Sequence, residues 1–236
     1  MEGARTRVST ARALFSARRT IGVAALVAVF ASLTIVAGPL EAAPGQSREA
    51  AVRALAQPDV RARRDAASLL GEIGTMADAR ALVRALKDSD DETRENAEHA
   101  LWQIWSRSGD AAIDRLYAVG IHQMEEGELP DAIATFTQII ERKPDFAEAW
   151  NKRATLYFLV GELRKSLADC DEVMKRNPYH FGALAGYSQI YIRLEYYERA
   201  LEYARRALDV NPNMDGVRRS LLILEHVQEQ RRQQMI

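Results

Sequence analysis

The residue types that most often carry out chemistry are few and scattered in this sequence of 236 residues. Zinc sites and nucleophile-base pairs need His, Cys and acidic residues in recognisable clusters. The four histidines lie far apart, and none belongs to an H-x-x-x-H or Cys/His cluster: His99, His122, His180 and His226. Cys170 is the single cysteine, which excludes an intramolecular disulfide and is typical of a small buried hydrophobe rather than a reactive thiol. We therefore expect no metal site and no cofactor.

Two short motifs invite a calcium-binding or catalytic interpretation, but neither completes its pattern. The run DSDDE at 88–92 begins like a calcium loop, yet Thr93 stands where that loop needs Gly and His99 stands where it needs Glu. We expect a solvated loop and helix cap there. Ser188 lies in GYSQI rather than in a G-x-S-x-G elbow, and the chain has no glycine-rich phosphate loop. The sequence therefore nominates no catalytic residue, and we expect a protein that is not an enzyme.

Composition and charge indicate a folded protein that does not bind nucleic acid. The chain is 47% hydrophobic and 28% charged, as in ordinary globular domains. Its net charge of -1 hides an asymmetry, because residues 1–42 hold five Arg and only two Glu, which leaves about -4 on the remainder. A mildly acidic body has no long-range attraction for phosphate groups, so we expect no nucleic-acid partner.

The N-terminal segment 1–42 has the composition of an export signal. Arginines precede an uncharged apolar stretch at 20–40, and small residues follow it before Pro44. This stretch is long enough to be cleaved as a signal peptide or to stay as a membrane tether, and length alone does not separate the two. An organellar transit peptide is the alternative, although the long apolar core fits secretion better. We expect the body to be exported, to the bacterial periplasm, either soluble or anchored to the inner membrane.

A period of 34 residues runs through the C-terminal half of the chain. The period aligns large residues, small residues and prolines in register. The small-residue columns are Gly120, Ala154 and Ser188, and Ala132, Ser166 and Ala200; the proline column is Pro144, Pro178 and Pro212. Small residues let paired helices approach closely, glycines at 127 and 161 end the first helix of a pair, and the prolines follow the second. The pattern predicts antiparallel helix pairs.

These columns resemble the tetratricopeptide repeat family in three copies, at 113–146, 147–180 and 181–214. The resemblance implies stacked helix pairs with one concave face. Two residues depart from the family pattern. Arg153 stands where a large apolar residue is usual, and we expect its stem to be buried while its guanidinium stays wet. Glu195 replaces the turn glycine of the other copies, which makes the third turn less regular.

A shorter period of 31 residues occupies residues 43–110. It pairs Asp59 with Asp90, Arg63 with Arg94, and a series of Ala and Leu positions between them. An Asp that begins a helix can cap it, and the Arg four residues later can reach a neighbouring unit. This pattern resembles short HEAT-type repeats. Because two such units would rarely be stable alone, we expect them to dock onto the first tetratricopeptide unit through Trp102 and Trp105.

The segment 215–236 carries apolar residues at Val217, Leu221, Leu224 and Val227, which is a helical stripe typical of a capping helix. The predicted fold is therefore all-α: a helical-repeat solenoid of HEAT-like helix pairs, three tetratricopeptide helix pairs and a C-terminal capping helix.

The resemblance also implies where a partner would bind, because in this family the first helix of each pair lines a concave groove. Transferred to this chain, the predicted groove residues are Tyr117, Ile121, Met124, Asn151, Lys152, Thr155, Phe158, Leu159, Gln189, Ile192 and Arg193. The large apolar members either bury partner side chains or fill contacts between repeats. Family members that clamp chaperone tails use Lys, Asn and Arg at positions where this chain has Tyr117, Ile121, Lys152, Gly182 and Gly186, so we do not expect a chaperone-tail adaptor.

The leading hypothesis is a non-enzymatic scaffold of the cell envelope that binds a protein or peptide partner in this groove. A structural module for self-association is the alternative. A third hypothesis, a chromophore lyase, follows from the resemblance of some such enzymes to short HEAT arrays.

Overall fold

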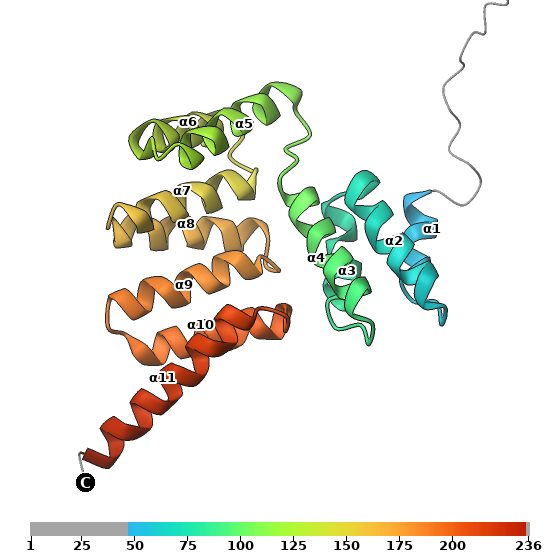
Figure 1. The fold of residues 1–236 in the computed structure, drawn as a ribbon. Helices are drawn as coiled ribbons and strands as arrows, with labels where there is room; N and C mark the ends of the chain where they lie inside the picture. The colour runs from blue at the N-terminus through green and yellow to red at the C-terminus, as the bar shows by residue number, and fades with distance from the viewer. Residues whose placement is uncertain (1–46, 235–236) are drawn as a thin grey trace, which may run out of the picture. The chain divides into compact units, whose positions relative to one another are not determined.

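Residues 47–234 are described by a computed structural model and form eleven α-helices and one short 3-10 helix, η1 (Figure 1). The helices are α1 (Arg48–Ala54), α2 (Val60–Ile73), η1 (Met76–Asp78), α3 (Ala79–Ala85), α4 (Asp91–Trp105), α5 (Ala111–Glu125), α6 (Leu129–Arg142), α7 (Ala147–Leu159), α8 (Leu163–Arg176), α9 (Phe181–Arg193), α10 (Tyr197–Val210) and α11 (Asp215–Gln234). The predicted export segment 1–42 lies outside the described residues. No helix within the described range is long and apolar enough to span a membrane.

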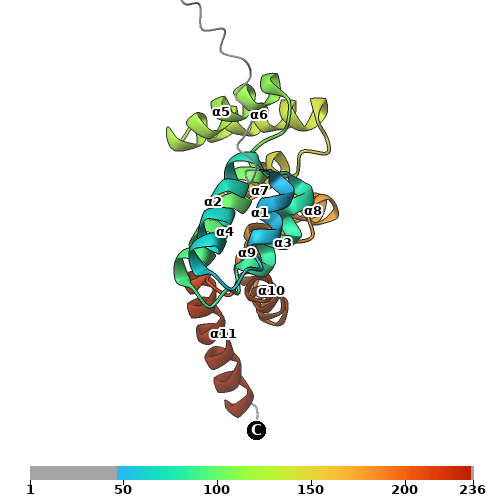
Figure 2. The same cartoon turned by 90° about the vertical axis from the view of Figure 1, so that its right-hand side faces the viewer.

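Helices α1 to α4 form the N-terminal helices, in which α1 packs on α2, α3 packs on α4, and α2 lies along α4 (Figure 2). Asp59 caps α2 by accepting a hydrogen bond from the amide of Arg61, and Asp90 caps α4 by accepting one from the amide of Thr93. The expected helix cap in the 88–92 run is therefore present.

The two repeated arginines each tie their own turn to another part of the fold. Arg63 donates to the carbonyls of Gln57 and Pro58 and forms a two-point ion pair with Asp88, with nitrogen–oxygen distances of 2.8 and 2.9 Å. Arg94 donates to the carbonyl of Asp88 and to the side chain of Asn213. The 31-residue period thus repeats an interaction as well as a packing pattern.

The C-terminal half consists of three antiparallel pairs, α5 with α6, α7 with α8, and α9 with α10, as the 34-residue columns predict (Figure 1). The second helices begin at Leu129, Leu163 and Tyr197, and each start is 34 residues after the previous one. The helices end one residue before the Lys-Pro or Asn-Pro pairs, because proline cannot continue the hydrogen-bond ladder. Helix α11 packs against α10 and buries Leu224.

The small-residue columns lie where the paired helices meet. A Cβ atom added at Gly120 would lie 2.8 Å from Cζ of Phe136, a fully buried side chain on the partner helix. In the second pair the Ser166 hydroxyl donates to the carbonyl of Ala154 at 2.7 Å. Close helix approach therefore depends on these residues, because any larger side chain would occupy space already filled.

We predict opposite effects for the same substitution at two helical glycines. Gly120→Ala should lower the free energy of unfolding by about 1 to 2 kcal/mol, since overpacking against Phe136 exceeds the gain in helix propensity. Gly186→Ala should raise it by about 0.5 to 1 kcal/mol, because the new Cβ would meet only the Cys170 sulfur, at an ordinary 3.7 Å. Urea unfolding of both variants measures the difference, and equal changes would contradict the packing argument.

The turns inside the three pairs share one backbone conformation. Gly127 and Gly161 have φ angles of 77° and 84°, and Glu195 has a φ angle of 62° at the corresponding place. Side chains with a Cβ are disfavoured in this left-handed region, so the third turn has the same shape as the others at a conformational cost.

Glu195→Gly should therefore stabilise the chain by about 0.5 to 1 kcal/mol, since the relief of the left-handed strain exceeds the added freedom of the unfolded chain. Thermal unfolding tests the sign. A lower melting temperature for this variant would show that the Glu195 side chain makes a compensating contact.

The N-terminal helices contact the tetratricopeptide-like pairs at a place that differs from our expectation. The rings of Trp102 and Trp105 pack on His180 and Phe181, at the start of α9, with centroid distances of 4.5 to 5.5 Å. Asn213, after α10, also donates to the carbonyl of Leu86 at 2.8 Å. The docking prediction that named the first unit was therefore wrong, because Trp105 stacks on His180 and Trp102 meets His180 and Phe181 edge-on, where the second unit ends and the third begins.

Arg153 also differs from expectation, because its guanidinium is largely buried rather than exposed to solvent. Its side chain is 13% exposed and forms a two-point ion pair with Asp169, which is 5% exposed; both nitrogen–oxygen distances are 2.8 Å. The guanidinium also donates to the Thr137 hydroxyl and lies over the Trp150 ring. A charge can stand at an apolar position here because the neighbouring helix supplies the opposite charge.

Candidate functional site

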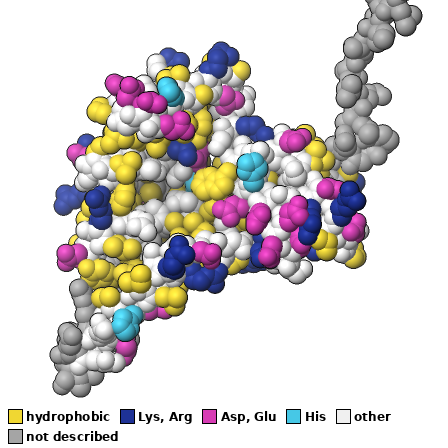
Figure 3. Space-filling view, in the orientation of Figure 1, with side chains coloured by type: hydrophobic (Ala, Val, Ile, Leu, Met, Phe, Trp, Pro, Cys, Tyr) yellow, Lys and Arg dark blue, Asp and Glu magenta, His cyan; other side chains and the backbone are white. Residues whose placement is uncertain are grey.

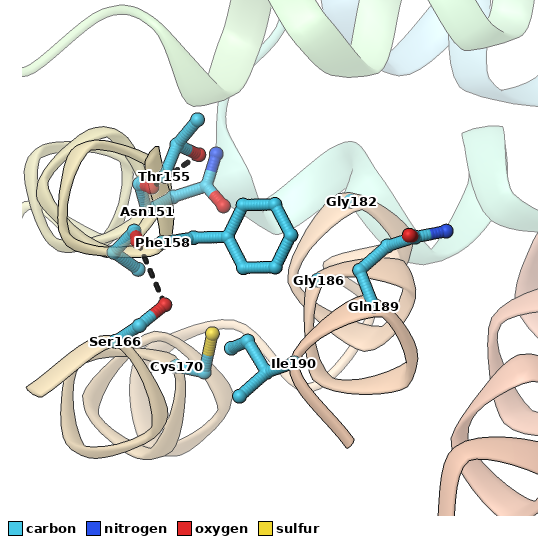
Figure 4. Close-up of a pocket in the computed structure, with 10 residues that line it drawn as sticks. Asn151, Thr155, Phe158, Ser166, Cys170, Gly182, Gly186, Gln189 and Ile190 are labelled. Carbon is cyan, nitrogen blue, oxygen red and sulfur yellow. Dashed lines mark hydrogen bonds between the residues drawn. The ribbon is translucent and has the colours of Figure 1, made fainter. Parts of the chain in front are cut away.

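An open, apolar pocket lies between α7 and α9, on the surface formed by the first helices α5, α7 and α9, which we call the groove. It has a volume of about 180 Å³. Figure 4 shows Phe158 extending from α7 toward α9, with Cys170 and Ile190 below it. The lining residues are Asn151, Ala154, Thr155, Phe158, Ser166, Cys170, Gly182, Gly186, Gln189 and Ile190.

The pocket is bordered on α9 by two residues that have no side chain. Gly182 and Gly186 are one helical turn apart, and a Cβ at Gly186 would approach only the Cys170 sulfur. A dry apolar cavity of roughly 150 Å³ accommodates a benzene ring. The α7–α9 pocket is therefore large enough for one aromatic or branched aliphatic side chain.

Phe158 lines the pocket and also packs against the core of the second and third pairs. Its side chain is half-buried, and the Arg193 guanidinium lies 4.7 Å from its ring centroid. Arg193 also donates to the Phe158 carbonyl at 2.8 Å. The arginine from the third pair therefore contacts both the ring and the backbone of the phenylalanine of the second pair.

A buried polar network lies at the start of α7, next to the pocket. The Glu148 carboxylate is fully buried and accepts hydrogen bonds from His180 Nε2 at 2.8 Å and from the Asn151 amide at 3.2 Å. Lys152 lies 3.0 Å away. Burial raises the pKa of Glu148, but the hydrogen bond from His180 and the attraction of Lys152 outweigh it, so the pKa lies below its ordinary value.

His180 joins this network to the N-terminal helices. Its Nδ1 accepts a hydrogen bond from the amide of Ala183 at 3.0 Å, which places the ring proton on Nε2, where it is donated to Glu148. The imidazole stacks on the Trp105 ring at 4.5 Å. One fully buried side chain therefore contacts α4, α7 and the first turn of α9.

The predicted groove residues fall into two sets. Those at the pocket or its mouth are Asn151, Thr155, Phe158, Gln189 and Arg193, and Lys152 reaches the network through Glu148. Ile121, Met124 and Ile192 are half-buried and pack against the repeat cores, and Leu159 is 54% exposed at the end of α7. Tyr117 differs from expectation, since it is buried against Phe136 and Phe146 and offers no free surface.

Several pocket residues were not predicted from the sequence. Cys170 and Ile190 form the floor, and the contribution of Gly186 is the absence of a side chain. The pair of glycines one turn apart on a first helix was the available signal. Burial raises the pKa of the Cys170 thiol to about 12, so the thiol stays uncharged and forms an apolar part of the pocket floor.

Within residues 47–234, no group of His, Cys, Asp and Glu is placed to hold a metal ion.

Comparisons with known proteins match the repeated half of the chain. Residues 182–214 match the tetratricopeptide repeat family. A TPR repeat-containing protein of Rhizobium etli is 39% identical over 108 residues, which are 46% of this chain and 53% of that protein. Hsp70-Hsp90 organizing protein 1 of Glycine max is 27% identical over 104 residues, which are 42% of this chain and 18% of that protein.

Among solved structures, the TPR domain of Sgt2 from Aspergillus fumigatus matches with a TM-score of 0.50 and 21% identity, and covers 52% of this chain and 83% of that domain. At this identity the likeness shows the fold alone. The chain spans about half the length of the Rhizobium relative and less than a fifth of the organizing protein. Residues 182–214 therefore match a tetratricopeptide repeat, and the other two helix pairs share its 34-residue period, while the HEAT-type resemblance of 43–110 stays a prediction.

Proposed function

We propose, from the premise that the chain carries tetratricopeptide repeats, that it is a non-enzymatic scaffold which binds an extended protein segment in the groove. The α7–α9 pocket carries this proposal, because it is apolar, open and sized for one partner side chain. Thr155 and Gln189 are exposed beside it and can hydrogen-bond to the backbone of the segment. Burial of one large apolar side chain stabilises such a complex by about 1.5 to 3 kcal/mol.

Two substitutions at Gly186, with side chains of increasing size, test this function at a position where an added Cβ meets no clash. Gly186→Leu should fill the pocket and weaken partner binding about 10- to 100-fold, which corresponds to the loss of one buried side chain. Gly186→Ala should leave binding nearly unchanged, because its methyl group meets no clash. The measurement is affinity capture from an envelope extract, with each variant's unfolding curve recorded.

Phe158→Asp should give the same loss as Gly186→Leu, since it places a charge at the mouth of the pocket. Val119→Asp is the matched control, because Val119 is 49% exposed on α5 and does not line the pocket. Identical captured proteins for the wild type and both pocket variants would contradict the proposal, as would capture of none by the wild type.

Export of the body to the periplasm is part of the proposal, and it is supported by the sequence of residues 1–42.

A second candidate function, self-association, is favoured by one surface feature. Leu222 and Ile223 on α11 are 60% and 65% exposed, whereas the next residue, Leu224, is buried. Light scattering of the wild type and of Leu222→Asp distinguishes a self-associating module from a monomeric receptor.

A further inference from the structure

One face of α4 carries a row of acidic residues that ends at a tryptophan. Asp91, Glu95, Glu98 and Trp102 are separated by four, three and four residues, so they lie along one stripe of the helix. Figure 3 shows acidic side chains gathered over α4 beside a hydrophobic patch. We call Asp91, Glu95 and Glu98 the acidic stripe.

Trp102 connects this stripe to the α7–α9 pocket. A Cβ atom at Gly182 would lie 2.7 Å from Cη2 of Trp102, and Gly182 is one of the residues that line the pocket. The half-buried Trp102 ring therefore lies against Gly182, at the α9 edge of the pocket, although it does not line the pocket itself. A segment that leaves the pocket past Gly182 meets α4.

The charge on the stripe is only partly neutralised within the described residues. A surface depression of about 410 Å³ lies against the stripe and is lined on its other side by Asn213, Asp215 and Arg218. Arg94 is paired with Asp91, and Arg218 is paired with Asp215 at 3.9 Å.

In contrast, Glu95 and Glu98 have no ion pair in residues 47–234. Glu95 and Glu98 therefore face a depression whose two cations, Arg94 and Arg218, are already paired with other carboxylates. This arrangement is complementary to a basic side chain.

We propose that the bound segment carries a Lys or Arg close to its apolar anchor, and that α4 recognises this basic residue through Glu95 and Glu98. This inference rests on the proposed function. Along α4 the distance from Trp102 is about 6 Å to Glu98 and about 10 Å to Glu95, at 1.5 Å per residue. Extended peptide advances about 3.3 to 3.6 Å per residue, so this span from Trp102 takes about two to three residues. With up to about one more residue between the pocket and Trp102, the basic residue stands two to four positions from the anchor.

The N-terminal helices then act in recognition as well as in structure. The apolar pocket supplies most of the affinity, while the two carboxylates select the charge that follows the anchor. An acidic segment such as a carboxylate-rich tail would meet repulsion from the same side chains. The predicted ligand is therefore an apolar segment with a basic flank.

Selection from a random peptide library tests this inference. Displayed peptides of about twelve residues, long enough to cross both surfaces, are selected on the immobilised full chain in mild detergent. The wild type should enrich peptides with Lys or Arg two to four positions from an aromatic or aliphatic residue. Enriched peptides should bind Glu95→Gln/Glu98→Gln about five-fold more weakly at low salt, and the difference should shrink near ~0.5 M salt.

Glu198→Gln/Glu202→Gln is the matched control, because these two residues are exposed, four positions apart and carried by α10. It should bind the enriched peptides like the wild type. Enriched peptides without a basic preference, or equal affinity for the Glu95/Glu98 variant, would overturn the inference while leaving the groove intact. If Gly186→Leu enriches the same peptides as the wild type, or if no peptide is enriched, the groove itself fails and the inference fails with it.

Discussion

His180→Ala should lower the free energy of unfolding by about 3 to 5 kcal/mol, the largest effect that we predict for any single substitution in this chain. The substitution leaves the fully buried Glu148 carboxylate without its 2.8 Å hydrogen bond from His180. It also removes the ring that stacks on Trp105 and the side chain that caps α9. Urea unfolding monitored by circular dichroism measures the loss.

His99→Ala is the control for this experiment. His99 is exposed on α4, and within the described residues its side chain hydrogen-bonds only to Gln103. Its removal should therefore change the free energy of unfolding by less than about 0.5 kcal/mol. Similar losses for both variants would mean that the buried Glu148–His180 interaction does not hold the repeats and the N-terminal helices together.

Arg153→Leu should destabilise the chain by about 3 kcal/mol although it restores the apolar residue that is usual in this family. The substitution leaves Asp169, whose side chain is 5% exposed, as a buried charge without its partner. Thermal and urea unfolding give the change.

The double variant Arg153→Leu/Asp169→Leu distinguishes two contributions to the free energy of unfolding: the destabilisation by an unpaired buried charge, and the net stabilisation by the ion pair. Replacing both partners with apolar residues removes the unpaired charge, so we expect stability within about 1 kcal/mol of the wild type. A double variant as unstable as Arg153→Leu alone would show that packing around the arginine stem, rather than charge pairing, determines stability at this position.

The helix pairs of the C-terminal half could be predicted from the sequence because their spacing is fixed by packing. Gly120 must be small wherever Phe136 lies against it, and each proline must follow the end of a second helix. Such constraints act on single residues at constant intervals, so a period of 34 reveals them directly. The caps at Asp59 and Asp90 followed from the same kind of local rule.

The network at Glu148 and the docking of the N-terminal helices could not be predicted in this way. Glu148 and His180 are 32 residues apart, and nothing local indicates that either is fully buried. Likewise, the Arg153–Asp169 pair joins two helices. From the sequence alone, Arg153 was therefore predicted to depart from the family pattern and to keep its guanidinium in solvent. Contacts between elements depend on how the elements pack, which single positions do not reveal.

Groove recognition can be tested most directly by site-specific photo-crosslinking in living cells. A benzophenone side chain is placed at Thr155 or Gln189, which are exposed beside the α7–α9 pocket, and at Arg164, an exposed residue of α8 that does not line it. We expect both pocket positions to capture one and the same partner segment, and Arg164 to capture none of it. Capture of the same products from all three positions, or of none from the pocket positions, would contradict a recognition surface between α7 and α9.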